Sequence, residues 1–202
     1  MSHPEFYDEV PGIVLYDSLA AFLGATDDGL LRYGYPDAVR LAGHSCPTVA
    51  AAYWSTRKAL RSLYGDEIPV RGDIRVEFGQ AREQGVTGVI ANVVSLLTGA
   101  MAEEGFKGLG GNFDRRKRLF FEVDLPGEMR FTRIDRNRSV VVSADLRRVP
   151  VPPRLPELMA SCMAGEASAA DAAEFRRLWQ RRVRSILLEH GDDPAVFVVT
   201  PG

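Results

Sequence analysis

The sequence contains few of the residues that build disulfide frameworks and metal clusters. Its 202 residues include only two cysteines and three histidines. Two cysteines cannot form the disulfide network of a small secreted domain, and they suit a reducing compartment. The first residues also lack the positive charge and the apolar run of a signal peptide. These absences predict a cytoplasmic protein.

The sequence also lacks a long apolar run and a large excess of charge. Its longest apolar-rich stretch, residues 86–102, is interrupted by Asn92, Ser95, Thr98 and several glycines, which favours a buried core helix over a membrane span. The formal net charge is only -2, so no global field attracts nucleic acid. We interpret the basic run at residues 114–118 as a solvated turn. We therefore expect neither a membrane nor a nucleic acid as a partner.

The remaining composition is that of a globular protein, with 46% hydrophobic and 26% charged residues. Apolar residues recur at helical spacing after Pro47, which is well placed as the first residue of a helix. Residues 88–103 are apolar around most of a helix and predict a central buried helix. Alternation predicts a strand at 74–78, and the 129–134 and 140–146 segments predict a hairpin.

These elements predict an α+β fold, in which a mixed or antiparallel sheet packs against the central buried helix. The prolines at 150, 152 and 153 remove ladder donors, so this segment predicts an extended connector rather than a central strand. Helices are predicted at 155–163 and 170–189, followed by a short strand at 196–199. We assign residues 1–148 to the core and residues 149–202 to a helical appendage packed on it.

One short segment could carry chemistry, namely Gly43-His44-Ser45-Cys46-Pro47. The free N–H groups and dipole of the helix starting at Pro47 would stabilise a thiolate on Cys46. If the segment is extended, the His44 side chain lies on the same side, where the two residues could form an ion pair or ligate zinc. The alternative is a buried thiol used for packing beside a surface histidine.

This segment resembles the Gly-His-x-Cys-Pro-Gly signature of the formylmethanofuran dehydrogenase FmdE family. Residues 91–99, which end in Leu97-Thr98-Gly99, are similar to a buried helix of that family, and Phe106-Lys107-Gly108 and Leu119-Phe120-Phe121 follow in the same order. The resemblance covers roughly residues 41–123. It implies an α+β core that forms a homodimer, with a metal-binding cleft near the His-x-Cys motif.

The sequence departs from the family pattern at three positions. Ala42 stands where many members have a histidine, and Val89 and Asn92 stand where they have a cysteine and an aspartate. The cysteine-rich zinc finger that ends some members is absent. His44 and Cys46 would therefore need additional ligands, from Asn92, His190, water or a second chain.

These observations predict a metal- or small-ligand-binding protein, either a redox-related auxiliary or an enzyme of unknown reaction. Cys46 would be the thiolate and His44 its fellow ligand or general base. Asn92 would be a polar group of the pocket, and Lys107 would contact an anion there, unless it is simply an exposed loop lysine. Zinc is the expected metal, with iron as the alternative. The alternative function is a non-catalytic dimeric scaffold or accessory subunit that has lost the metal site.

Overall fold

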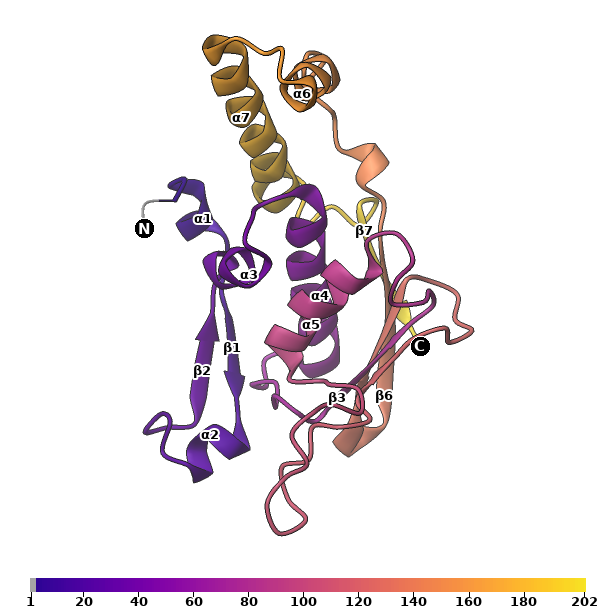
Figure 1. Cartoon of the computed structure of the whole chain (residues 1–202). Helices are drawn as coiled ribbons and strands as arrows, with labels where there is room; N and C mark the ends of the chain where they lie inside the picture. The colour runs from indigo at the N-terminus through magenta and orange to yellow at the C-terminus, as the bar shows by residue number, and fades with distance from the viewer. Residues whose placement is uncertain (1–2) are drawn as a thin grey trace.

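The computed structural model describes residues 3–202 and shows an α+β fold built on a five-stranded mixed sheet (Figure 1). Its strand order is β4-β3-β5-β6-β7, and only the β3–β4 pair is parallel. The predicted hairpin is confirmed, with Met129 opposite Val142. The strands are β3 (Ile74–Phe78), β4 (Leu119–Phe120), β5 (Met129–Arg133), β6 (Arg138–Ala144) and β7 (Phe197–Pro201).

The helix at the centre of the fold is α4 (Pro47–Tyr64), not the 88–103 segment that the sequence predicted. α4 lies on the sheet against β6 and β7, and α5 (Thr87–Thr98) lies on its other side, as the outer layer (Figure 1). The prediction was wrong because a high apolar content was taken to mean that a helix lies at the centre of the fold. α4 is rich in alanine, and small side chains such as Ala50, Ala52 and Ala59 let it pack closely on two sides.

The N-terminal part forms a small two-stranded layer that the sequence did not predict. α1 (Phe6–Glu9) precedes an antiparallel pair, β1 (Ile13–Tyr16) and β2 (Leu30–Tyr33), and α3 (Tyr35–Ala42) follows it. Between the strands lies α2 (Ser18–Phe22). The Asp17 carboxylate accepts hydrogen bonds from the N–H groups of Leu19 and Ala20, which caps this helix.

The C-terminal part consists of α6 (Leu155–Ala164), α7 (Ala169–Arg184) and a π-helical turn (Ser185–Glu189) before β7. The two helices extend away from the sheet (Figure 1). Leu155, Leu158 and Leu178 form a separate small apolar cluster between them. Beyond that cluster the chain re-enters the main core through Ile186, Leu187 and Phe197. Residues 149–202 therefore combine a projecting helix pair with an integral part of the sheet.

The chain also contains two short 3₁₀ turns, Ile134–Arg136 within the hairpin and Leu146–Arg148 after β6. Within residues 3–202, no helix combines the length and the apolar character that a bilayer span requires.

Candidate functional site at the start of helix α4

Cys46 occupies the position that the sequence predicted, directly before the first turn of α4. Its backbone is extended, and Sγ accepts a hydrogen bond from the Val49 N–H at 3.5 Å. The sulfur thus caps the helix. The side chain is nevertheless buried, with the residue only 9% exposed, and it belongs to the main apolar core. This burial limits the access of a reagent or metal ion to the sulfur.

His44 lies in a different environment from Cys46. The residue is exposed, and its Nδ1 is 2.9 Å from the carbonyl oxygen of Ala42. Gly43 beside it ends α3 in a left-handed conformation with φ 74°, which turns the chain into the motif. No hydrogen bond joins the imidazole to the Cys46 sulfur in the described part of the chain. The structure therefore does not bring the two into the direct contact expected of a nucleophile and its base.

Asn92 and Lys107, the two residues predicted to line the pocket, lie elsewhere. Asn92 is exposed on the outward side of α5. Lys107 is exposed in the long loop between α5 and β4, which extends from the end of the molecule opposite the start of α4 (Figure 1). Within one chain, the four predicted site residues do not form one pocket.

Ser45, which sequence reasoning did not select, is the residue of the motif that takes part in the most hydrogen bonds with side chains of other elements. Its Oγ lies 2.9 Å from the hydroxyl of Tyr35 and donates to Gln180 Oε1 at 3.3 Å. Gln180 Oε1 also accepts a hydrogen bond from the Tyr7 hydroxyl at 3.0 Å. Trp179 donates its indole N–H to the Ser45 carbonyl oxygen at 2.8 Å. α7 is therefore attached to the motif by side-chain hydrogen bonds.

The two tyrosines of this network are neutral at physiological pH, and burial strengthens this preference. Desolvation raises the pKa of Tyr35 well above its usual range, although the hydrogen bond to Ser45 acts in the opposite direction. The pKa of Tyr7 is raised for the same reason. Neutral hydroxyls can both donate and accept, as a network of this kind requires. The network therefore serves as a structural joint, with its polar groups satisfied by one another.

A zinc site needs at least three protein ligands, and the motif supplies two candidates. In the part of the chain that the structure describes, no group of three or more His, Cys, Asp or Glu side chains is arranged to hold a metal ion. His190, considered as an additional ligand, instead lies 3.6 Å from the Asp193 carboxylate. The residues of one chain thus do not fit the predicted zinc or iron centre.

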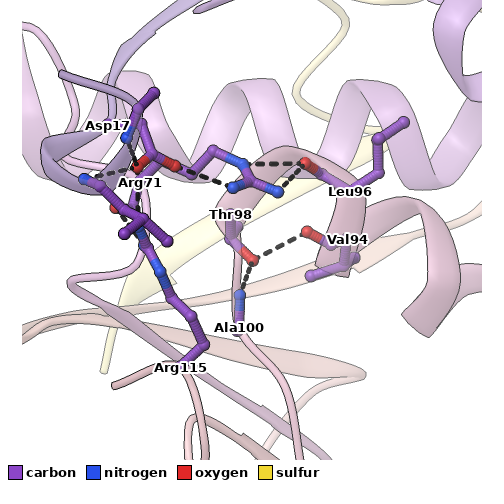
Figure 2. A network of polar contacts seen from close by, with 9 residues as sticks. Asp17, Arg71, Val94, Leu96, Thr98, Ala100 and Arg115 are labelled. Carbon is purple, nitrogen blue, oxygen red and sulfur yellow. Dashed lines mark hydrogen bonds and ion pairs between the residues drawn. The ribbon is translucent and has the colours of Figure 1, made fainter. Parts of the chain in front are cut away.

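The most strongly charged buried network lies at a second place, around Asp17 (Figure 2). Its two carboxylate oxygens accept hydrogen bonds from Arg71 at 2.9 Å and from Arg115 at 2.8 Å. Arg71 also donates to the carbonyl oxygen of Leu96, and Arg115 donates to that of Arg71. Arg115 belongs to the basic run that was interpreted as a solvated turn, but it is only 6% exposed.

The Leu-Thr-Gly end of α5 lies beside this network. Thr98 Oγ1 donates to the Val94 carbonyl oxygen at 2.8 Å and accepts from the Ala100 N–H at 3.2 Å (Figure 2). Gly99 has φ 72°, and a Cβ there would lie 3.2 Å from the backbone nitrogen of Gly72. The glycine therefore allows the end of α5 to approach the segment that carries Arg71. The role of this block is structural.

Two opposing effects set the charge state of Asp17. Burial by itself would raise its pKa, but the hydrogen bond from Arg71, the Ala20 N–H and the positive charge of Arg115 together hold the pKa below its usual value. The carboxylate is therefore ionised at neutral pH and balances two arginines in a dry environment. Its environment is that of a structural ion-pair cluster.

A cavity of about 570 Å³ lies beside the start of α5 and is lined by none of the four predicted site residues. Glu122, Asp124 and Glu128 contribute carboxylates to its lining, and Gln80 accepts a hydrogen bond from the Thr87 hydroxyl at 3.0 Å.

No family model and no curated protein matches the sequence. The resemblance to the formylmethanofuran dehydrogenase FmdE family accordingly stays a prediction.

Proposed function

We propose that the protein is a homodimeric scaffold or accessory subunit, and that the outward face of α5 forms the centre of the dimer. The observation that carries this proposal is the character of that face. α5 contains no charged residue among its twelve, yet it is the outer layer of the fold. A helix in contact with water is expected to carry charged side chains on its wet side.

The residues of this face suit close packing against an identical helix. The side of α5 that is not buried in the chain carries Val89, Asn92 and Leu96, flanked by Gly88 and Ser95. An uncharged surface meets its own copy without like-charge repulsion, and twofold pairing is the commonest closed assembly. The resemblance to the FmdE family implies the same oligomeric state.

A dimer needs more surface than one helix provides. The twelve residues of α5 form a helix about 18 Å long. One face of so short a helix covers less area than the roughly 800 Å² that each partner contributes to a stable interface. Apolar residues near the helix offer further exposed surface. Val86, just before α5, is 51% exposed, and Leu41 on α3, a helix that contacts α5, is 48% exposed.

The contacts at the start of α4 support a non-catalytic role. Ser45 is satisfied by Tyr35, Gln180 and Trp179, and the Cys46 sulfur caps its own helix. The polar atoms of the motif thus serve the docking of α7, and little remains for a substrate except the exposed ring of His44. This use of the motif favours the scaffold over an enzyme or a small-ligand site at the same place.

Light scattering on the native protein tests the proposal. We expect twice the monomer mass of 22.2 kDa at micromolar concentration. Leu96→Glu, which places a charge on the outward face, should give a folded monomer. Met163→Glu is the matched control, because Met163 is 81% exposed on α6 and far from this face. A monomeric wild type, or a dimer that survives Leu96→Glu, would rule out this interface.

Metal binding is the second candidate, favoured by the position of the Cys46 sulfur at a helix start two residues after an exposed histidine. Because one chain supplies too few ligands, such a site would take the rest from a second copy or from water. Elemental analysis of untagged protein tests it. Stoichiometric zinc or iron that is lost in both Cys46→Ser and His44→Ala supports the metal site, and its absence from the wild type contradicts it.

A further inference from the structure

A second cavity, of about 540 Å³, lies between the connector that precedes α6 and the outer side of α7. It is independent of the motif at the start of α4. Leu178, Arg181, Arg182 and Ser185 line it from α7 and the π-helical turn, whereas Trp179 and Gln180 contact the motif. The volume falls within the range of about 300–1,000 Å³ typical of small-molecule sites.

One wall of this cavity is apolar and stiff. The connector contributes Pro150, Val151, Pro152 and Pro153, and α7 contributes Leu178. Prolines restrict the backbone and carry no N–H group, so this wall presents carbon atoms and offers few donors. A hydrocarbon chain or an aromatic ring could lie along it without losing hydrogen bonds to the protein.

The other wall carries positive charge without a counter-ion. Among the described residues, the guanidinium groups of Arg181 and Arg182 take part in no ion pair or hydrogen bond, and the Nε of Arg182 is fully buried without a partner. The acidic residues of the same cavity are already engaged. Glu174 binds Arg154 at 3.0 Å, and Glu189 binds Arg184 at 2.8 Å.

A buried guanidinium N–H without a partner is destabilising, since it has lost its water without gaining an acceptor. An apolar side chain of similar length would avoid this penalty at Arg182. The buried Nε is out of reach of a ligand, but the terminal N–H groups of Arg181 and Arg182, which also have no partner among the described residues, can donate to an acceptor that comes from outside the chain. The planar guanidinium fork matches a carboxylate, which it can bind through two parallel hydrogen bonds.

The backbone departs from regular helix at the same place. The π-helical turn at Ser185–Glu189 closes with a hydrogen bond from the His190 N–H to the Ser185 carbonyl oxygen at 2.9 Å. Such turns are rare and often mark functional sites. Here the wider turn keeps Ser185, Glu189 and His190 on the cavity side.

We propose that this cavity binds a small organic acid with an apolar body, a monocarboxylate of medium chain length. The carboxylate lies between Arg181 and Arg182, and the hydrocarbon body lies along residues 150–153 and Leu178. The charge of the one wall and the carbon surface of the other select this combination over an inorganic anion or a neutral lipid.

Calorimetry with the full chain tests the proposal, using octanoate, butyrate and inorganic phosphate as probes. We expect saturable binding of octanoate, weaker binding of butyrate and none of phosphate. Arg182→Met and Arg181→Met should each weaken octanoate binding by about tenfold or more, the expected effect of losing a charge-assisted hydrogen bond. Arg176→Met is the matched control, because Arg176 is exposed on α7 and does not line the cavity.

Thermal unfolding without ligand separates binding from a structural role. Arg182→Met should leave the melting temperature unchanged or raise it, because it removes a buried donor that has no acceptor. The proposal is overturned by any of four results: no saturable octanoate binding, phosphate binding as tightly as octanoate, equal losses in Arg176→Met and Arg182→Met, or octanoate binding that is unaffected by Arg181→Met.

Discussion

Trp179 on α7 donates a hydrogen bond to the carbonyl oxygen of Ser45, in the middle of the motif before α4. The two residues are separated by 134 positions in the sequence. Through this bond the C-terminal helix is attached to the segment that the sequence singled out as a site of chemistry. The motif and the helix therefore form one structural unit.

Trp179→Phe should lower the stability of the protein. Phenylalanine retains most of the aromatic packing but cannot donate, so the Ser45 carbonyl oxygen loses its partner in a largely buried place. We expect a loss of about 1–3 kcal/mol in the free energy of unfolding, measured by urea denaturation. Trp54→Phe is not a suitable control, since its indole also donates to a buried carbonyl oxygen, that of Gly191. Met163→Leu, at an exposed position, should change the value little.

Asp17→Asn should be among the most destabilising single substitutions outside the apolar core. The amide can still cap α2, but it leaves Arg71 and Arg115 without their counter-charge. Because the side chains of Asp17 and Arg115 are only 4% and 8% exposed, we expect a loss of about 3–5 kcal/mol. Asp27→Asn, at an exposed aspartate in the connection between β1 and β2, should stay within about 0.5 kcal/mol of the wild type in the same measurement. Equal effects of the two would show that the cluster contributes no stability.

The stability of the protein should fall in acid, in part through Asp17. Its pKa is lower in the folded state than in the unfolded chain, so its contribution is complete above about pH 4 and is lost as the pH falls through the folded-state value. Denaturation of wild type and Asp17→Asn at several pH values between about 7 and 3 tests this sign. The difference in the free energy of unfolding between wild type and Asp17→Asn should become smaller as the pH falls. A difference that is the same at every pH would contradict the predicted sign.

The two cysteines should react at different rates. The helix start favoured a reactive Cys46, but the structure buries it while Cys162 on α6 is partly exposed. Burial should dominate, so we expect iodoacetamide to modify Cys162 first in the folded protein. Mass spectrometry of peptides taken at short times measures both rates. Faster modification of Cys46 would contradict this expectation and support the sequence-based prediction of an activated thiolate.

The sequence predicted those parts of the fold whose signals are local. Pro47 starts α4 as expected, and the alternating segments around residues 134–140 form the predicted hairpin. The β1–β2 pair was missed because its strands have four residues each and are separated by α2, which leaves no short turn signal between them. The sequence also did not predict that α4 is the central helix and α5 the outer one. Periodicity shows which face of a helix is apolar, but not which layer of the fold the helix occupies.

The candidate site was predictable only in part, for a similar reason. The position of Cys46 at the helix start follows from its neighbour Pro47. The partners of Ser45 do not, because Gln180 comes from a distant helix and no local pattern connects them. Arg115 was interpreted as solvated because it lies in a basic run, where only tertiary contacts distinguish one buried arginine from its exposed neighbours.

The hydrogen bond between Tyr7 and Gln180 joins residues that are 173 positions apart. A contact of such long range closes a large loop and can form only after both flanking parts have been brought together. We therefore expect the docking of α1 against α7 to be a late step of folding. The outer turns of α7, residues 169–176, contain no buried residue, so they should open before the sheet does. In native-state hydrogen exchange, the outer turns of α7 would then exchange through local opening, and α4 only through global unfolding.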